Sequence, residues 1–171
     1  DDRYKLLKPG DSVVDLGAAP GGWTQVAVDR VGSIKGKGQV LALDILEMEP
    51  MKGAKTIQLD FTEDGADTKV KNMLGGPVNA VISDMAAPTT GHKQTDHLRI
   101  VFMCELALDF AVDVLAPDGV FIAKVLKGGT ENQLLDLLKR NFKNVRHAKP
   151  EASRPDSREA YVVATGFRGN D

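Results

Sequence analysis

Short apolar runs alternate with longer amphipathic segments along this chain, and that alternation most narrows the folds open to it. The apolar runs predict strands at residues 13–16, 40–43, 56–59, 80–82, 120–125 and 161–164, with a weaker seventh strand through Val145. Apolar residues spaced three and four apart predict helices at residues 24–31, 64–74, 95–115 and 131–141. This order favours parallel strands whose crossover helices cover both faces of the sheet. The sequence therefore predicts an open, doubly wound α/β sheet.

Length and composition indicate a single domain, residues 1–171. A chain of this length, with 42% apolar residues, is able to bury one full core. Its single cysteine excludes an internal disulfide framework, and no stretch approaches the roughly 20 apolar residues of a membrane span. No signal peptide is visible. We therefore expect a cytoplasmic protein that makes no membrane contact, and we expect a monomer.

A glycine-rich loop, DLGAAPGGW at residues 15–23, follows the first predicted strand. In an open α/β sheet, ligands bind beyond the carboxyl ends of the strands, near the switch point beside the first strand. The loop does not match the G-x-G-x-x-G of dinucleotide-binding proteins, and Pro20 lacks the N–H group that an anion would use. Gly17, Gly21 and Gly22 are thus suited to the close approach of a ligand that carries an adenosine but no phosphate.

Two acidic residues follow the next two predicted strands at the same edge. Asp44 ends the second strand, where an acidic residue binds the ribose diol in nucleoside-binding α/β folds. Asp60 follows the third strand and could accept a hydrogen bond from an adenine amino group, with the Phe61 ring packed on the base. The other interpretation of both carboxylates is turn or helix-cap chemistry. The adjacent glycine loop favours a cofactor.

An aspartate and a lysine lie in or at the end of predicted strands, where burying a charge costs free energy. Asp84 closes the fourth strand and points toward the edge that carries the glycine loop, or else it caps a turn. Lys124 shares a face of its apolar strand with Val120 and Ile122, so a carboxylate partner is expected, because burying an unpaired charge costs on the order of several kcal/mol. Glu159, at the start of the last strand, is the candidate partner if that strand lies beside the one with Lys124. Otherwise it is a solvated strand end.

Four motifs together resemble a known family. VVDLGAAPGGWTQ, ISDMA, AKVL and SREAYVVATGF stand in the order and approximate spacing of the FtsJ/RrmJ family of ribose 2′-O-methyltransferases, across nearly the whole chain. The resemblance implies a Rossmann-like fold with a seven-stranded, mostly parallel sheet of order 3-2-1-4-5-7-6, in which the last strand is antiparallel. It also implies an enzyme that uses S-adenosyl-L-methionine, releases S-adenosyl-L-homocysteine, and methylates a uridine 2′-hydroxyl of ribosomal RNA in the large ribosomal subunit.

The resemblance also implies roles for individual residues. The cofactor contacts of the family fall on Gly21, Gly22, Trp23, Asp44, Asp60 and Asp84. Its catalytic lysine and glutamate fall on Lys124 and Glu159, and Asp84 joins them because the methyl group would be presented toward it. The family also has an earlier catalytic lysine, which would lie upstream of Asp1. Lys5 lies too near the Lys-Pro-Gly of residues 8–10 to be that lysine, so we expect that an N-terminal segment of the family is missing here.

The implied chemistry is in-line methyl transfer. A sulfonium methyl group is already activated and mainly needs an oxygen nucleophile about 3–3.5 Å away. Lys124 would orient the 2′-oxygen or accept its proton as a general base. Burial opposes charge on the lysine while two nearby carboxylates favour it, so both roles stay open. No metal is required by this scheme, and His92, His97 and His147 lack convincing ligand spacing.

RNA binding requires a local basic surface, because the net charge of the chain is −2. Residues 139–158 carry an excess of +5, with Glu151 and Asp156 as the acidic members. The basic members are Lys139, Arg140, Lys143, Arg146, Lys149, Arg154 and Arg158. We expect this segment to bind RNA phosphates beside Glu159, rather than to be a solvated helix face and loop. Aromatic residues make up only 5% of the chain, which favours recognition through RNA shape or ribosomal context.

Three other functions stay open. A 2′-O-methyltransferase of transfer RNA or of messenger-RNA caps would use the same residues and differ only in substrate. A non-catalytic ribosome-binding module could keep the fold, and a failure to transfer methyl groups would indicate it. A nicotinamide-dependent oxidoreductase is disfavoured by the missing G-x-G-x-x-G, although preferential binding of a dinucleotide would revive it.

Overall fold

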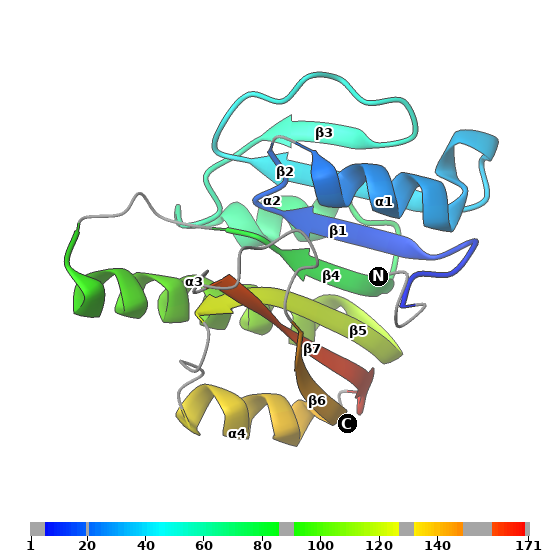
Figure 1. Cartoon of the computed structure of the whole chain (residues 1–171). Helices are drawn as coiled ribbons and strands as arrows, with labels where there is room; N and C mark the ends of the chain where they lie inside the picture. The colour runs from blue at the N-terminus through cyan, green and yellow to red at the C-terminus, as the bar shows by residue number, and fades with distance from the viewer. Residues whose placement is uncertain (1–5, 20, 86–90, 127–131, 149–158, 170–171) are drawn as a thin grey trace.

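The computed structural model describes residues 6–19, 21–85, 91–126, 132–148 and 159–169. They form one seven-stranded sheet of order β3-β2-β1-β4-β5-β7-β6 (Figure 1). The strands are β1 (Ser12–Leu16), β2 (Gln39–Asp44), β3 (Lys55–Gln58), β4 (Val78–Ser83), β5 (Leu115–Leu126), β6 (Phe142–Ala148) and β7 (Glu159–Phe167). The helices are α1 (Gly22–Val31), η1 (Ser33–Lys35), α2 (Ala66–Met73), α3 (Lys93–Val114) and α4 (Asn132–Asn141).

The pairing confirms the predicted fold class and strand order. Strands β1 to β5 pair in parallel, whereas β7 pairs antiparallel with both β5 and β6. The weak strand predicted through Val145 is β6, at one edge of the sheet. The short 3-10 helix η1 was not predicted. No helix in the described ranges is long and apolar enough to span a bilayer.

Strand β5 begins earlier than the sequence predicts. It starts at Leu115, directly after α3, and so includes Pro117-Asp118-Gly119, a sequence typical of a turn. Asp118 has a φ of 67°, and the register between β4 and β5 shifts between Val78 and Ala80. The turn residues therefore bend the strand and shift its register without ending it.

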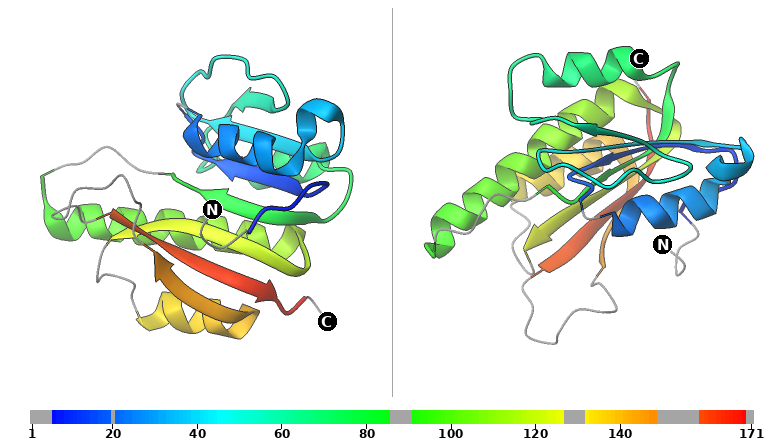
Figure 2. Two further views of the ribbon diagram at one scale, coloured as in Figure 1. Left: turned by 45° about the vertical axis from the view of Figure 1, so that its right-hand side comes forward. Right: turned by 90° about the horizontal axis from the view of Figure 1, so that it is seen from above.

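The core lies on both faces of the sheet, as near-continuous apolar strands require. Helices α2, α3 and α4 cover one face and α1 covers the other (Figure 2). Alternation along β5 shows the division, because Phe121 belongs to the core under α3 and α4 whereas Ile122 belongs to the core under α1. Phe121 stacks on Phe142 of β6, with ring centroids 6.2 Å apart.

Backbone hydrogen bonds continue past the carboxyl ends of the strands and fix where the loops leave the sheet. The Asp84 N–H donates to the Leu16 carbonyl at 2.9 Å, and the Ala18 N–H donates to the Leu43 carbonyl at 2.9 Å. The Leu59 N–H donates to the Asp44 carbonyl at 2.8 Å. The loops that follow β1, β2, β3 and β4 therefore leave from one edge of the sheet, which we call the carboxyl edge.

Gly17 allows the closest approach at the carboxyl edge. Its φ is +70°, and an added Cβ atom would lie 2.6 Å from the backbone nitrogen of Met85. Gly36, at the end of η1, has a similar φ of +76°, but an added Cβ atom there would meet nothing within 4 Å. Both glycines adopt a positive φ, which favours glycine. Only at Gly17 would a side chain also collide with the backbone of a neighbouring segment.

We predict that Gly17→Ala destabilises the protein more than Gly36→Ala. The Gly36 variant should lose about 1 kcal/mol of unfolding free energy from its positive φ. The Gly17 variant should lose roughly 2–4 kcal/mol, because the methyl group must also push the end of β4 away from β1. Urea unfolding of the two variants and the parent measures the difference. Equal losses would show that the Met85 backbone yields without cost.

Candidate active site

A lysine, an aspartate and a tyrosine meet at the carboxyl edge. The Lys124 Nζ lies 3.7 Å from the Asp84 Oδ1, and the Tyr161 hydroxyl donates a hydrogen bond to the same oxygen at 3.3 Å. The Lys124 side chain is 17% exposed and that of Asp84 is 30% exposed. Asp84 is therefore a carboxylate partner of Lys124, and Glu159, the partner that the sequence suggested, stays a prediction.

The strand register explains why these residues meet. Lys124 on β5 is directly opposite Tyr161 on β7, so both side chains lie on the face that α1 covers. Asp84 follows β4, which is the other neighbour of β5. Glu159 is opposite Leu126 in the same ladder, so its strand does lie beside that of Lys124, as the sequence prediction required. The side chain of Glu159 lies outside the described residues, and its role stays a prediction.

The first turn of α1 supports Tyr161. The Trp23 ring meets the Tyr161 ring edge to face, with centroids 5.6 Å apart and planes at 81°. Trp23 also packs against the apolar core under α1. The observed contact of Trp23 is thus with a residue of the site, and contact with a cofactor stays a prediction for it.

The predicted cofactor acids make turn contacts. Asp44 Oδ2 accepts a hydrogen bond from the Ala19 N–H at 2.9 Å, and its Oδ1 accepts one from the Leu46 N–H at 2.8 Å. Asp44 therefore ties the glycine loop to the end of β2. Asp60 Oδ1 accepts hydrogen bonds from the N–H and the hydroxyl of Thr62, and these bonds lower the pKa of Asp60. Both contacts leave acceptor positions on the carboxylates for a ligand.

Phe61 lies in the core rather than in open space beside Asp60. Its side chain is 5% exposed and meets the Phe110 ring of α3 edge to face, with centroids 5.3 Å apart. Phe61 and Phe110 both belong to the apolar core between the sheet and α3. Contact with an adenine ring, which the sequence predicted for Phe61, would be limited to the small part of its surface that is exposed.

Asp15 is a buried acid that the sequence analysis did not single out. It is fully buried on β1, and its Oδ2 accepts a hydrogen bond from the Thr24 hydroxyl at 2.7 Å. Its Oδ1 has no hydrogen-bond partner among the described residues. Burial, partly offset by the Thr24 hydrogen bond and reinforced by the charges of Asp84 and Asp44, raises the pKa of Asp15 to about 7.

We predict that Asp15→Asn removes part of the pH dependence of stability. Because the pKa of Asp15 is raised from 3.8 to about 7 on folding, the folded state holds a proton that the unfolded state releases. The unfolding free energy of the parent should therefore fall as pH rises from about 4 to about 7, by up to roughly 4 kcal/mol from this residue. Urea unfolding at several pH values should show the parent losing stability relative to the Asn variant.

The matched control is Asp29→Asn, at an exposed position on α1. This variant should keep the pH dependence of the parent. If the unfolding free energies of Asp15→Asn and of the parent change equally with pH between about 4 and about 7, Asp15 does not hold a proton in the folded state.

The glycine loop leaves the start of α1 open. Gly21, which precedes α1, has a φ of 127°, and the helix has neither a side-chain cap nor an acidic residue in its first turn. An added Cβ atom at Gly22 would meet nothing within 4 Å. The first N–H groups of α1 thus lack a side-chain acceptor, and a carboxylate is a group they could bind.

The charges around the loop suit a cationic ligand. Asp15, Asp44 and Asp84 lie close enough together around the loop to interact electrostatically, and Lys124 is paired with Asp84. A pyrophosphate would meet repulsion here, whereas a sulfonium or ammonium group would be stabilised. The residues present therefore fit S-adenosyl-L-methionine. Within the described ranges, no three His, Cys, Asp or Glu residues gather as a metal site would require.

A cleft lies at the opposite edge of the sheet. It has a volume of about 640 Å³ and is lined by the first residues of strands β1 to β4, among them Ser12 and Lys55, together with residues 73–78. A second cleft, lined by Lys71, Asp113 and Arg168, adjoins it. Both clefts lie away from Asp84 and Lys124, so their size does not identify them with the chemistry.

Comparisons with known proteins agree with this geometry. A model of the family described as FtsJ-like methyltransferase matches residues 1–167. The chain belongs to the FtsJ-like methyltransferase family. It is 61% identical to the "Ribosomal RNA large subunit methyltransferase E" of Parvibaculum lavamentivorans over 176 aligned positions, which span 99% of this chain and 69% of that protein. It is 62% identical to the protein of the same name from Paramagnetospirillum magneticum, across 99% of this chain and 70% of that protein.

Solved structures show the same FtsJ-like fold. A Plasmodium falciparum protein provisionally named a ribosomal RNA methyltransferase superposes with a TM-score of 0.82 and is 29% identical, covering 99% of this chain and 93% of its own. A Streptococcus mutans protein provisionally named a methyltransferase, solved in complex with SAH, superposes with a TM-score of 0.58 at 14% identity. It covers 95% of this chain and 90% of its own. This second likeness concerns the fold alone.

Two residues of the site were missed from the sequence. Tyr161 is recognisable only once the register puts it opposite Lys124, although the alternation of β7 does place it on the same face as Val163. Asp15 had a clearer signal, because an acidic residue inside the apolar run of residues 13–16 is expensive unless it is protonated or bound.

Proposed function

We propose that this protein transfers the methyl group of S-adenosyl-L-methionine to the 2′-hydroxyl of a uridine in large-subunit ribosomal RNA. The pair of Lys124 and Asp84 carries the proposal, because it stands beside the glycine loop at the edge where α/β folds bind ligands. The names of the relatives above support ribosomal RNA as the substrate class. Such a protein would work in the cytoplasm, as a monomer.

The cofactor supplies an activated methyl group, and the chain supplies its position. Gly22 leaves room for the ligand, because an added Cβ atom there would meet nothing within 4 Å, whereas Gly17 and Gly21 let the chain pass close to Met85 and Met51. Asp44, which the Ala19 N–H ties to the loop, would accept hydrogen bonds from the ribose diol. Asp60 would accept from the adenine amino group. The carboxylate of Asp84 would stabilise positive charge on the ligand, and so would Asp15 once its proton, which it holds up to about pH 7, is released.

Lys124 would position the nucleophile. Its ion pair with Asp84 favours the ammonium form, which donates hydrogen bonds but accepts none. The ammonium would therefore donate to the 2′-oxygen and hold one of its lone pairs toward the methyl group. The proton of the 2′-hydroxyl would leave to solvent water as the oxygen accepts the methyl group. The hydrogen bond from Tyr161 fixes the Asp84 carboxylate, and through it the lysine. Glu159 would complete the site from the first position of β7.

Strand β6 offers the basic surface for RNA. It is the outermost strand, and its Lys143 and Arg146 are exposed, as are Lys139 and Arg140 in the last turn of α4. The Lys143 ion pair with Asp118, at 3.5 Å, joins two largely exposed side chains and holds the lysine only weakly. The basic residues of the predicted segment at 149–158 lie outside the described residues. Ala148 is opposite Tyr161, so this surface would lead phosphates toward the site.

We predict that Lys124→Ala abolishes methyl transfer and leaves the cofactor bound. The substrate is large ribosomal subunits that lack the modification, with labelled S-adenosyl-L-methionine and mapping by resistance to alkaline cleavage. Transfer should fall by at least about 100-fold, the usual scale for losing a positioned proton-transfer or orienting group. Binding of S-adenosyl-L-homocysteine, measured by calorimetry, should stay within about threefold of the parent. Equal loss of binding and transfer would remove the catalytic role of Lys124.

The control for this experiment is Lys35→Ala, in the exposed last turn of η1, which should change neither quantity. Transfer by the parent to transfer RNA or capped messenger RNA, but not to ribosomal subunits, would replace the proposed substrate. Binding of subunits without any transfer would indicate a ribosome-binding module.

We predict that the single-turnover rate changes little with pH when Lys124 only orients the oxygen. The measurement runs from about pH 6 to about pH 9 with both substrates saturating, in the Asp15→Asn background, which removes the carboxyl group whose pKa is about 7. An orienting ammonium gives a nearly flat profile. A rate that rises about tenfold per pH unit would instead make Lys124 the general base.

A further inference from the structure

The first half of α3 presents an apolar stripe that the sheet does not cover. The helix runs past the carboxyl edge of the sheet (Figures 1 and 2), and Leu98 and Phe102, one turn apart, are 55% and 53% exposed. The same stripe continues at four-residue spacing through Leu106 to Phe110, and these two residues pack in the core. An apolar stripe of this kind normally faces a partner surface.

The acids in the second half of α3 are arranged against the preference of the helix dipole, whereas Asp96 in the first turn follows it. The first half carries Lys93 and Arg99 against Asp96, whereas the second half carries Glu105, Asp109 and Asp113, and the last turn has no basic residue. Helices are stabilised by acids at the start and bases at the end. The projecting half of α3 therefore has a net side-chain charge of +1 beside the positive end of the helix dipole, which favours a polyanionic partner.

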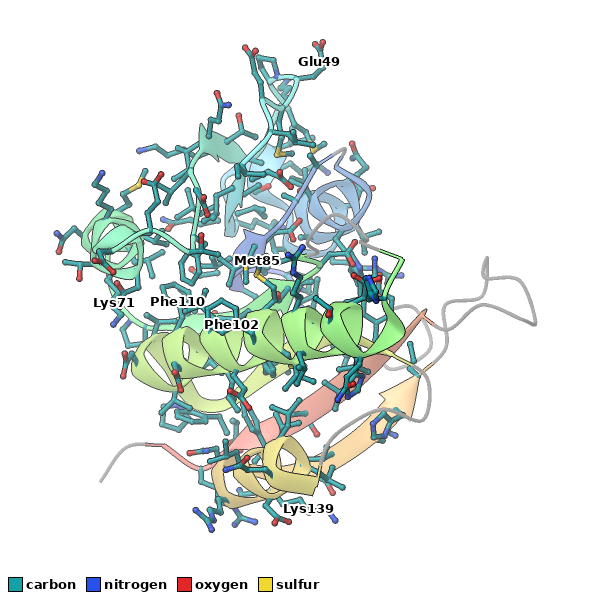
Figure 3. The ribbon with its side chains drawn as sticks, turned by 90° about the vertical axis from the view of Figure 1, so that its left-hand side faces the viewer. Glu49, Lys71, Met85, Phe102, Phe110 and Lys139 are labelled. Atoms are coloured by element: carbon teal, nitrogen blue, oxygen red, sulfur yellow. The ribbon has the colours of Figure 1, made fainter. Side chains whose placement is uncertain are left out.

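The exposed stripe adjoins the proposed active site. Met85 directly follows Asp84, and its side chain packs at the margin of the core that α3 covers. Figure 3, which looks at the carboxyl edge, shows the Phe102 ring on the flank of α3 directed to the same region as Met85. A nucleic acid whose ribose reached Lys124 would thus pass along the first half of α3.

We propose that Leu98 and Phe102 form a docking surface for an unpaired RNA base next to the methylated nucleotide, with the base stacked on Phe102. The inference rests on the proposed function, because it takes the substrate to be RNA. An aromatic ring beside a cationic helix end is how proteins hold unpaired bases: the ring stacks on the base and the positive end attracts the flanking phosphate. One exposed aromatic ring is sufficient for one base, so the low aromatic content of the chain is no obstacle.

The test compares Phe102 variants in two assays. One measures binding of a single-stranded RNA that carries 2-aminopurine, whose fluorescence is quenched on stacking. The other measures KM and kcat for large ribosomal subunits that lack the methyl group. Phe102→Ala should weaken RNA binding and raise KM by about tenfold, the usual scale for one base stacked on an aromatic ring, with kcat and cofactor binding unchanged. Phe102→Trp should retain both binding and quenching.

Phe102→Leu separates stacking from apolar contact, because leucine keeps apolar surface and lacks a ring face. This variant should lose as much RNA affinity as Phe102→Ala. Ile34→Ala, at a 51% exposed position on η1, is the matched control and should behave as the parent. The proposal is overturned if Phe102→Leu binds RNA like the parent, or if Phe102→Ala binds it equally well. It is also overturned if Phe102→Ala abolishes a self-association of the protein without changing RNA binding.

The two proposals fail in different ways. If the parent binds and quenches the 2-aminopurine RNA but transfers no methyl group to ribosomal subunits, the docking surface stands and the proposed reaction does not. If the parent methylates the subunits and the Phe102 variants match it in KM and RNA affinity, the reaction stands and the docking surface does not.

Discussion

The hydrogen bond from the Asp84 N–H to the Leu16 carbonyl fixes the geometry on which the site depends. It extends the pairing of β1 with β4 beyond the last strand residue, so that the glycine loop and the Asp84 carboxylate leave the sheet at the same level. The absence of a side chain at Gly17 permits the backbone of Met85 to lie against the loop. Since Lys124 is held by Asp84, the position of the lysine follows from the same backbone contact.

The site keeps charged groups where they weaken the fold. A fully buried Asp15 with an unpaired oxygen and a pKa raised to about 7 is less stable in its ionised form than in water. Lys124, on an otherwise apolar strand face, pairs with the Asp84 carboxylate 3.7 Å away. Perturbed acids and partly buried ion pairs of this kind concentrate at functional sites, because a ligand of opposite charge stabilises what the folded protein alone does not. The carboxyl groups around the glycine loop therefore agree with a cationic cofactor.

The sequence predicts the fold well because the fold is dictated by local pattern. Apolar runs buried on both sides and the glycine loop after β1 are readable without coordinates, and so is the position of Asp84 at the carboxyl edge. The contacts of Lys124 are not readable in this way, because they depend on the register between β5 and β7 and on where β4 ends. Phe61 shows the same limit: its position after Asp60 suggested a ligand contact, and tertiary packing against Phe110 determined its burial. The continuation of β5 through the turn residues at Asp118 also depends on pairing with β4, which the local sequence does not show.

The distribution of charge explains how one protein of net charge −2 could bind a cation and a polyanion at neighbouring places. The carboxylates of Asp15, Asp44 and Asp84 lie around the glycine loop, whereas the exposed bases of α4 and β6 lie at the outer edge of the sheet. Exposed charges farther apart than about 8–10 Å are screened from each other at physiological salt, so RNA at the basic edge would be little affected by the acids. Lys124 lies between the two regions, and its ammonium would meet the ribose oxygen where the two ligands come together. The ammonium of Lys124 would therefore orient the ribose oxygen at the place where the acidic and the basic regions meet.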